Sequence, residues 1–304
     1  MTAPRHDMAL DWGLAALTSA VQTALPGAVV QAVSQVASTN TALLELGRRT
    51  EAPLLPGLLP HLLVAEQQTQ GRGRLGRAWH ASPGASLTFS LALPLAPQSW
   101  NGLSLAVGLA LARALEPEPG NRPRIGLKWP NDLWLWEGPG QGRKLGGVLI
   151  ETAGSAVGAA RWCVVGVGLN VRAQPLHGPS AGSACLEELS RAGAAEPTAP
   201  GVLATVAPAL ARALRTFQAQ GFAPLLSAYA ERDVLHGQAV ATLEAGMAGL
   251  HGVAEGVTAD GALRLRAGAL HHVVSGEVSV RLQVAAPAQG AVSCALVSAP
   301  GAPC

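Results

Sequence analysis

The chain has 304 residues, 49% of them hydrophobic and 13% charged, so it can bury a large core and is expected to be globular and ordered. Its formal net charge of +2 and the lack of any run of like charges exclude a general polyanion-binding surface. The longest apolar stretch, residues 102–115, contains Arg113 and is too short to span a bilayer, and the N-terminus lacks the pattern of a signal peptide. We therefore expect a cytoplasmic protein without membrane association.

Apolar residues in the first 232 positions alternate between helical and strand spacing. Helices are expected at residues 10–24, 41–49, 103–115 and 199–232. Strands are expected at residues 31–36, 61–68, 86–93, 125–129, 132–136, 144–151 and 160–171. Strands and helices in this uneven order predict an α/β or α+β sheet.

After Leu235 the sequence changes to short strands separated by glycines. Asp260-Gly261 is a hairpin signal, and residues 276–282 contain the last expected strand. A run of about 50 residues of this kind suits a small β-barrel of the SH3 type. The low-complexity end is expected to be a frayed tail. The predicted units are residues 1–232, 233–284 and 285–304.

The four cysteines lie far apart, without CxxC spacing and without paired histidines. They are Cys163, Cys185, Cys294 and Cys304. This pattern predicts reduced thiols, either buried or in the tail, and argues against a zinc site.

Residues 70–80, QGRGRLGRAWH, place three glycines and three arginines in one short loop between two expected strands. Glycines let backbone N–H groups approach a ligand closely, and arginines offer paired donors to carboxylate or phosphate oxygens. The alternative is an exposed RGG-like loop that binds nucleic acid weakly or has no role. Trp79 favours a site because an aromatic ring after such a loop can stack on a base, although a tryptophan before a strand also suits a core.

Residues 128–134, KWPNDLW, place a cation, an amide and a carboxylate around a proline. Proline fixes the backbone, so this stretch is expected to be a rigid corner that aims Asn131 and Asp132 in a definite direction. Ordinary turn chemistry is the alternative, because Asn and Asp commonly follow proline in turns.

In RKLGGVLIE, Lys144 heads an apolar strand whose Gly146 and Gly147 leave room for a ligand, although a lysine that caps a strand end would look the same. GVGLN, which ends in Asn170, has the same character and is a weak signal alone. Of the 21 basic residues, 19 are arginine, and the exceptions are Lys128 and Lys144. This bias favours a need for an ammonium group at both positions over chance retention.

In this order, the motifs STN, QTQGRGRLGRAWH, KWPNDLW, RKLGGVLIE and VVGVGLNV resemble the catalytic domain of biotin protein ligases, over residues 28–283. The resemblance implies an α+β fold with a central mixed sheet and helices, of the class II synthetase-like kind, followed by an SH3-like barrel. It also implies an enzyme that uses biotin, ATP and Mg²⁺ to form biotinyl-5'-AMP. The implied partner, whose lysine receives the biotin, is the biotin carboxyl carrier protein of acetyl-CoA carboxylase.

The resemblance implies a role for each matched residue. The implied biotin-binding residues are Ser38, Thr39, Asn40, Gln68, Gly71, Arg72, Lys144, Gly147, Gly166 and Val167. The implied ATP-binding residues are Arg72, Arg74, Arg77, Trp79, Asn131, Lys144, Asn170 and Arg281. The implied catalytic residues are Lys144, Arg74 and Asp132.

Within these sets, Lys144 would bridge the biotin carboxylate and the α-phosphate. Trp79 would stack on adenine and Asn131 would read its edge. Asp132 would accept a proton from the incoming lysine or orient it. Asn170 would lie by the phosphates or the Mg²⁺ ion.

The sequence differs from the family pattern in two respects, and two other functions are possible. Only 37 residues precede Ser38, which predicts a ligase without a DNA-binding domain, and Leu75 stands where a second consecutive basic residue is common in the family. A lipoate-type protein ligase would be expected to lack GRGRLGR and KWPND at this spacing. A nucleic-acid-binding module built on GRGR conflicts with the near-neutral charge. An exposed edge strand could pair two copies, so monomer and homodimer both stay open.

Overall fold

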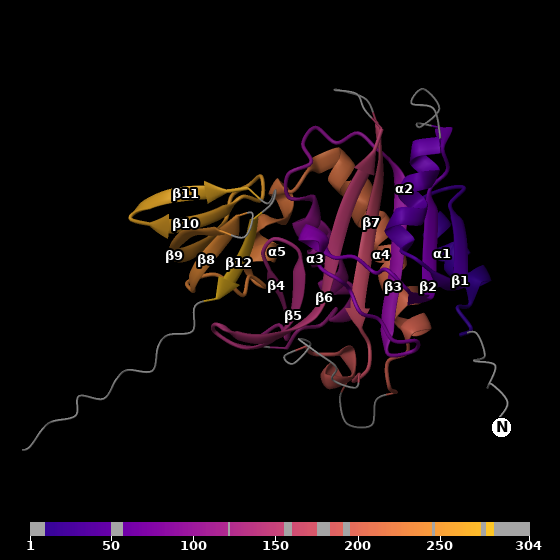
Figure 1. Cartoon of the computed structure of the whole chain (residues 1–304), viewed down its shortest axis with the longest axis horizontal. Coiled ribbons are helices and arrows are strands. Elements are labelled where there is room, and N and C mark those ends of the chain that lie inside the picture. The colour runs from indigo at the N-terminus through magenta and orange to yellow at the C-terminus, as the bar shows by residue number, and fades with distance from the viewer. Residues whose placement is uncertain are drawn as a thin grey trace, which may run out of the picture.

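Two β-sheets organise the part of the chain that the computed structural model describes (Figure 1). The described residues are 10–49, 57–120, 122–154, 160–174, 183–190, 195–244, 247–274 and 278–282. The larger sheet has seven strands in the order β1-β2-β3-β7-β6-β5-β4, and the smaller has five in the order β11-β10-β9-β8-β12. Strands β1 and β2 pair in parallel, whereas the other pairs of the larger sheet are antiparallel, so the predicted central mixed sheet is confirmed.

The predicted elements of the first 232 residues have counterparts in the structure, with small shifts in their bounds. The strands of the larger sheet are β1 (Val29–Val36), β2 (His61–Gln68), β3 (Ser86–Leu95), β4 (Ile125–Lys128), β5 (Asp132–Gly138), β6 (Gln141–Ala153) and β7 (Arg161–Asn170). The α-helices are α1 (Leu14–Gln22), α2 (Thr39–Arg49), α3 (Leu103–Leu115), α4 (Ala199–Gln220) and α5 (Leu226–Ala230). The short 3₁₀ helices are η2 (Arg74–Gly76), η3 (Leu186–Leu189) and η4 (Ala223–Leu225). The expected helical region at 199–232 therefore divides into α4, η4 and α5.

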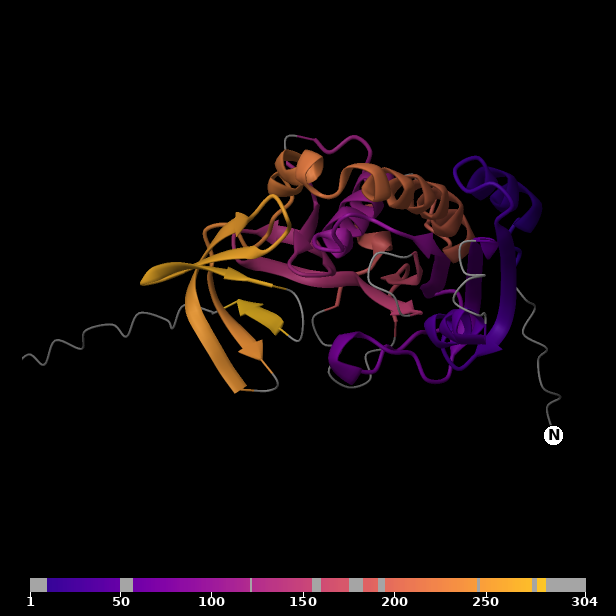
Figure 2. The same cartoon turned by 90° about the horizontal axis from the view of Figure 1, so that it is seen from above.

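The larger sheet has two different faces, which Figure 2 shows from its edge. Helices α1, α3 and α4 cover one face, where alternate residues of β3 and β7 such as Phe89 and Val165 are fully buried. Helix α2 packs on the opposite face against Trp162 and Val164. Because side chains alternate across a strand, Gly166 shares this second face with Val164. The second face is the one that the loop at residues 70–80 covers.

The smaller sheet is antiparallel throughout. Its strands are β8 (Ala239–Glu244), β9 (Met247–Val257), β10 (Leu263–Ala267), β11 (Ala269–Val273) and β12 (Val278–Leu282). The predicted turn at Asp260-Gly261 does connect β9 to β10, and Gly261 has the positive φ of 80° that this turn needs. This sheet is consistent with the expected SH3-like unit. The predicted tail at 285–304, with Cys294 and Cys304, lies outside the described residues.

A tryptophan fixes the smaller sheet against the larger one. The indole Nε1 of Trp129 donates a hydrogen bond to the carbonyl oxygen of Gly261 at 3.0 Å, and the ring is 1% exposed. The turn between β9 and β10 also lies close to the start of α3, because a Cβ atom on Gly261 would lie 2.7 Å from the Cα atom of Gly102. The smaller sheet therefore sits beside the β4 edge of the larger one (Figure 1).

The two described cysteines, Cys163 and Cys185, are buried free thiols, as predicted. Burial raises the pKa of Cys163 to about 12, which keeps this thiol protonated. Among the described residues no cluster of three or more His, Cys, Asp or Glu side chains could hold a metal ion. In the same ranges, no helix has the length and apolar character needed to cross a membrane.

A buried carboxyl group lies where the two sheets join. Asp233 is 3% exposed, and its Oδ1 accepts a hydrogen bond from the backbone N–H of Leu235 at 2.9 Å. Its Oδ2 and the hydroxyl of Tyr229 are buried, and neither has a hydrogen-bond partner among the described residues. Burial, opposed in part by the hydrogen bond to Leu235 and by the nearby His236, raises the pKa of Asp233 to about 6.

This raised pKa predicts a loss of stability as the pH rises. Between pH ~4, the pKa of an unfolded Asp, and pH ~6, Asp233 stays protonated in the folded chain and ionises in the unfolded chain, so its contribution to the free energy of unfolding falls by roughly 3 kcal/mol. Denaturant unfolding from pH 4 to pH 8 would show that Asp233→Asn lacks this fall, so the variant gains stability relative to the parent as the pH rises. If the free energy of unfolding had the same pH dependence in the parent and in Asp233→Asn, the prediction would be contradicted.

Candidate active site

The loop at residues 70–80 is a closed hairpin on the second face of the larger sheet. The N–H of Trp79 donates to the carbonyl oxygen of Gly71 at 2.9 Å, and the N–H of Gly73 donates to that of Arg77 at 2.7 Å. A Cβ atom on Gly71 would lie 2.4 Å from the carbonyl oxygen of Trp79, so this position requires glycine. Leu75 has a φ of 57°, a left-handed conformation that is uncommon for a leucine. These contacts hold the arginines of the loop over the sheet.

The first turn of α2 forms one end of the candidate site, which we name the α2 end and define by Ser38, Thr39, Asn40, Gln68 and Ser90. Ser38, Thr39, Asn40 and Ser90 are each at most 4% exposed. The Oε1 of Gln68 accepts hydrogen bonds from the N–H of Thr39 at 2.7 Å and from its hydroxyl at 3.2 Å. The hydroxyl of Ser90 lies 2.7 Å from that of Thr39. This end is polar, buried and uncharged.

Asn40 lies directly on a glycine of the sheet. Its Oδ1 accepts a hydrogen bond from Ser90 Oγ at 2.6 Å, and its Nδ2 donates to the carbonyl oxygen of Leu149 at 3.2 Å and to Glu151 Oε2 at 2.9 Å. A Cβ atom on Gly166 would lie 2.2 Å from Asn40 Oδ1. The missing side chain at Gly166 therefore permits the position of this amide.

The opposite end of the site, which we name the β5 end, is defined by Arg74, Asn131, Asp132 and Lys144. Lys144 Nζ and Asp132 Oδ1 form an ion pair at 2.7 Å, with the side chains 41% and 19% exposed. Arg74 Nη1 donates to Asn131 Oδ1 at 3.3 Å, and Asn131 Nδ2 donates to the carbonyl oxygen of Val148 at 2.8 Å. Two predicted catalytic cations thus lie beside the predicted carboxylate.

Further positive charges gather at the β5 end. Lys128 Nζ lies 4.9 Å from the centre of the Trp134 ring. Burial lowers the pKa of Lys128, Asp132 opposes this effect, and the positive charges of Lys144, Arg77 and Arg281 add to it. The smaller sheet therefore contributes Arg281, on β12, to the electrostatic field of this end.

Arg74 experiences the same field. Burial lowers its pKa and Arg77 adds to the effect, whereas Asp132 opposes it. A cavity of about 10 Å³, close to the size of one water molecule, is lined in part by Lys128, Asn131 and Asp132. Such a concentration of cations around one carboxylate is suited to bind an anion.

Trp79 lies between the two ends, on Gly168 of β7. A Cβ atom on Gly168 would lie 2.5 Å from Cε2 of the indole, and Lys144 Nζ is 5.9 Å from the ring centre. The indole Nε1 is buried and has no hydrogen-bond partner in the described part of the chain. The ring therefore occupies the glycine-lined floor between the α2 end and the β5 end.

The structure places two predicted residues differently from the others. Val167 has its side chain in the core beneath α3 and α4, because it alternates with Gly166 and Gly168 along β7. Only the backbone of Val167 can therefore contribute to the site. Asn170 lies at the end of β7, where its Nδ2 donates to the carbonyl oxygen of Ala184 at 2.9 Å.

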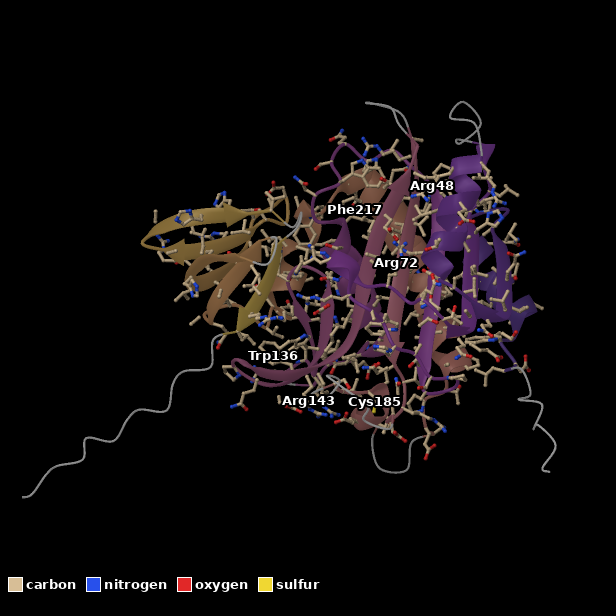
Figure 3. All side chains as sticks on the ribbon, in the orientation of Figure 1. Arg48, Arg72, Trp136, Arg143, Cys185 and Phe217 are labelled. Carbon is tan, nitrogen blue, oxygen red and sulfur yellow. The ribbon has the colours of Figure 1, made fainter. Side chains whose placement is uncertain are left out.

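Sequence reasoning missed three residues of the site, which are Ser90, Glu151 and Gly168. Each lies on the second face of the larger sheet. Gly168 could have been predicted from the sequence, because it follows Gly166 by two residues on the same strand and so faces the same side. Ser90 and Glu151 required the register between strands, because Ser90 pairs with Gly166 and Glu151 with Val164. The loop arginine Arg72 is the partner of Glu151, at 3.3 Å, and Figure 3 shows it in front of the larger sheet.

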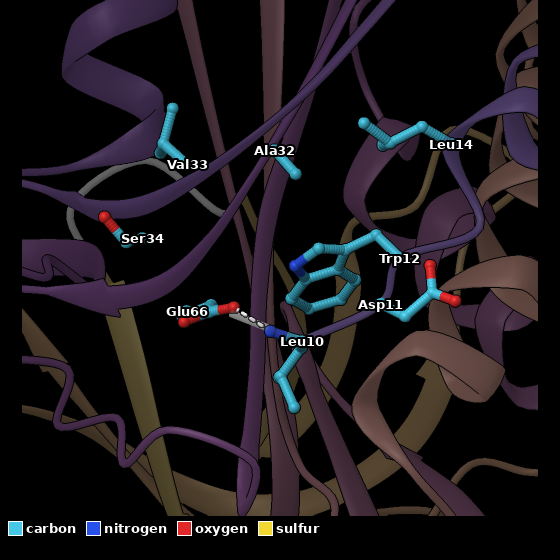
Figure 4. Close-up of a pocket in the computed structure, with 8 residues that line it drawn as sticks. All are labelled: Leu10, Asp11, Trp12, Leu14, Ala32, Val33, Ser34 and Glu66. Carbon is cyan, nitrogen blue, oxygen red and sulfur yellow. Dashed lines mark hydrogen bonds between the residues drawn. The ribbon is translucent and has the colours of Figure 1, made fainter. Parts of the chain in front are cut away.

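A larger cavity lies at the other edge of the sheet, beside β1 (Figure 4). Its volume is about 330 Å³, and its lining includes Trp12, Ser34 and Glu66. None of the residues predicted for biotin or ATP lines it. The convergence of predicted residues, rather than cavity size, therefore locates the candidate active site.

Comparison with known proteins identifies the family of the chain. The model of the biotin/lipoate A/B protein ligase family matches residues 33–170. The biotin–[acetyl-CoA-carboxylase] ligase of Paracoccus denitrificans is 34% identical over 244 residues, which cover 78% of this chain and 94% of that relative. The bifunctional ligase/repressor BirA of Escherichia coli is 33% identical over 221 residues, which cover 72% of this chain and 65% of BirA, just under two thirds of its length.

A solved structure is similar over most of the chain. The biotin protein ligase from Aquifex aeolicus in complex with biotin and ATP has a TM-score of 0.65 and 26% identity, and the match covers 84% of this chain and 99% of that one. The matched family model spans both ends of the candidate site, from α2 to Asn170. The chain therefore belongs to the biotin/lipoate A/B protein ligase family, as a biotin protein ligase.

Proposed function

We propose that this chain forms biotinyl-5'-AMP from biotin and ATP and then transfers the biotin to a lysine of a biotin-accepting carrier domain. The observation that carries the proposal is the division of one sheet face into a polar end, where the charges of Glu151 and Arg72 pair with each other, and a cationic end. Biotin has an uncharged ring system with a ureido group at one end and a carboxylate at the other. The face therefore matches the charge distribution of biotin joined to a nucleotide.

The α2 end suits the ureido group. A buried ureido group needs partners for its N–H groups and its carbonyl oxygen, because an unpaired buried polar group costs about 1–3 kcal/mol. Thr39, Asn40 and Ser90 supply hydroxyl and amide groups within one hydrogen-bonded cluster, joined to Gln68. Gly147 and Gly166 have no side chains, so the polar groups of Lys144 and Asn40 lie directly against the backbone of this face.

The β5 end suits the first chemical step. A carboxylate oxygen of biotin attacks the α-phosphorus of ATP, a new O–P bond forms, and the bond to pyrophosphate breaks. Lys144 and Arg74 lie together beside Asp132, where they can neutralise the carboxylate and the phosphate oxygens. Preorganised charges of this kind stabilise phosphoryl-transfer transition states without rearranging during the reaction. Arg77 and Arg281 add positive charge from the loop and from β12.

The nucleotide base is proposed to bind at Trp79. Its half-buried indole offers a flat surface for stacking, next to the proposed phosphate-binding cations. Asn131 is proposed to read the adenine edge. In the structure its Oδ1 accepts a hydrogen bond from Arg74, and the second lone pair of this oxygen is the proposed acceptor for the adenine amino group.

Asp132 is proposed to act in the second step. The amine of the acceptor lysine attacks the carbonyl carbon of the mixed anhydride, a C–N bond forms, and AMP leaves. The amine must be neutral to attack, so a carboxylate that accepts its proton or orients it assists the step. The ion pair of Asp132 with Lys144, at 2.7 Å, supports this role, because Lys144 is the cation proposed to bind the phosphate of the leaving AMP.

Magnesium is proposed to enter with ATP. Mg²⁺ prefers oxygen ligands and commonly binds through substrate phosphates with few protein groups. Asn170 is the predicted protein ligand, and its amide nitrogen is already bound by the carbonyl oxygen of Ala184, which leaves the amide oxygen as the available group. The proposed acceptor is the biotin carboxyl carrier protein of acetyl-CoA carboxylase, and a cytoplasmic location stays a prediction.

Transfer to a carrier domain tests the complete proposal. The purified chain is mixed with biotin, ATP, Mg²⁺ and a biotin-accepting carrier domain, and biotinylation is followed by mass spectrometry. We expect one biotin on the acceptor lysine, none on a carrier whose acceptor lysine is arginine, and none when lipoate replaces biotin. Transfer of lipoate in place of biotin would assign the chain to the lipoate branch of the family instead.

A further inference from the structure

A hydrogen-bonded chain of side chains ends at a carboxylate that the proposed reaction does not use. Glu151 lies on β6, on the same sheet face as Gly147. Its Oε2 accepts a hydrogen bond from Asn40 Nδ2 at 2.9 Å, and each of its oxygens lies 3.3 Å from Nη2 of Arg72. One carboxylate therefore contacts both the α2 end and the Gly-Arg loop.

The loop arginine has a second contact on the same side. Nη2 of Arg72 donates to the hydroxyl of Thr41, on α2, at 3.0 Å. Arg74, two residues later, is hydrogen-bonded to Asn131 at the β5 end. The two arginines that the resemblance assigns jointly to carboxylate and phosphate thus lie at opposite ends of the site.

Glu151 also determines how Asn40 presents its amide. Ser90 donates to Asn40 Oδ1 at 2.6 Å, and Glu151 accepts from Asn40 Nδ2, so the two ends of the amide have chemically different partners. A carboxylate accepts and cannot donate when ionised, which excludes the flipped amide. Asn40 is 3% exposed, so little solvent competes for these hydrogen bonds.

We propose that Glu151 is a positioning residue that latches the Gly-Arg loop over the α2 end by binding Arg72, while it holds Asn40 for biotin. The inference rests on the proposed function, because it concerns access to the same site. Arg72 then acts through Glu151 and not as a phosphate ligand. The cations that meet the phosphates are those of the β5 end, with Arg74 as the loop's contribution.

Trypsin measures the latch without any catalysis, because the loop offers cleavage sites after its three arginines. The full chain without biotin or ATP is digested under native conditions, and mass spectrometry reports cleavage between residues 70 and 80. We expect Glu151→Gln to be cut there about threefold faster than the parent, since a partly exposed ion pair is weak. The glutamine retains an acceptor for Asn40, so the fold and the α2 end are preserved.

The matched control is Glu255→Gln. Glu255 forms a comparable surface ion pair with Arg266 at 2.7 Å on the smaller sheet, and it is 30% exposed against 27% for Glu151. We expect the parent rate of loop cleavage in this variant. Equal cleavage in the parent and in Glu151→Gln would overturn the latch.

A double-mutant cycle separates the latch from direct phosphate binding. We expect Arg72→Gln and Glu151→Gln each to raise KM for biotin about three- to tenfold, with kcat within about twofold, and the double variant to do no more than the stronger single variant. If the increases in KM of the two single variants multiplied in the double variant, or if only Arg72→Gln lost kcat, Arg72 would instead be a direct ligand of substrate.

The two tests also keep the latch distinct from the proposed function. Faster loop cleavage in Glu151→Gln together with a parent protein that forms no biotinyl-AMP would retain the latch and remove the proposed function. An active parent whose loop cleavage and biotin KM do not change in Glu151→Gln would retain the function and remove the latch.

Discussion

Lys144→Ala is expected to lower the rate of biotinyl-AMP formation by about 10²–10³-fold, the size of effect seen when one preorganised donor is removed from a transition state. The Nζ of Lys144 lies 2.7 Å from Asp132 and 5.9 Å from the centre of the Trp79 ring, where carboxylate, phosphate and base are proposed to meet. Pyrophosphate release in the presence of biotin, ATP and Mg²⁺ measures the rate. The ion pair is partly exposed, so the free energy of unfolding should change by less than about 1 kcal/mol.

The neighbouring residue supplies a matched control. Arg143 is a cation of similar exposure, but its guanidinium binds Glu137 and Glu188, each at 2.6 Å. We expect Arg143→Ala to keep the parent rate within about twofold, whatever its effect on stability. A rate for Lys144→Ala that matches that of Arg143→Ala would remove Lys144 from the chemistry.

Gly166→Ala is expected to weaken biotin binding strongly. The new Cβ atom would lie 2.2 Å from Asn40 Oδ1, so Asn40 and the first turn of α2 must move. Forcing a methyl group into a packed site costs about 1–3 kcal/mol of folding stability whether or not biotin is bound. Loss of one hydrogen bond from the displaced Asn40 to biotin raises KM for biotin about tenfold. Titration with biotin at saturating ATP measures the change.

Gly73→Ala is the control for this substitution. Gly73 has a φ of –105°, which an alanine adopts freely, and a Cβ atom there would lie 3.5 Å from the carbonyl oxygen of Arg77, an ordinary contact. We expect KM for biotin within about twofold of the parent value. Equal changes in the two variants would mean that the close contact between Gly166 and Asn40 does not shape the biotin site.

Much of the fold could be predicted from the sequence because local patterns determine it. The strands at 61–68 and 86–93 and the helix at 103–115 were indicated by apolar spacing, and the structure has β2, β3 and α3 there. The mixed character of the sheet came from the family resemblance. The strand order was not predicted, because periodicity does not say which strands are neighbours. After Leu235 the sequence predicted short strands without bounds for β8, β9 and β11, and in β11 two adjacent histidines obscure the alternation.

The site residues that lie within the sequence motifs could be predicted. The order of STN, GRGRLGR, KWPND and RKLGG indicated the residues that the structure gathers at the α2 end and the β5 end. Glu151 and Ser90 could not be found in this way, because their role depends on the register of β6, β7 and β3 and on the side chains laid across them. The role implied for Val167 is one of its backbone, and the period of two along β7 agrees with this, since it puts the side chain on the face opposite Gly166.

A single-turnover measurement tests most directly the central claim that this face joins biotin to AMP. Excess enzyme is mixed with biotin, Mg²⁺ and ATP labelled at the α-phosphate, without any acceptor, and the acid-quenched products are separated. The account predicts that labelled biotinyl-AMP and pyrophosphate form together in the parent and are nearly absent in Lys144→Ala. ATP that stays intact, or label that forms equally in both proteins, would contradict it.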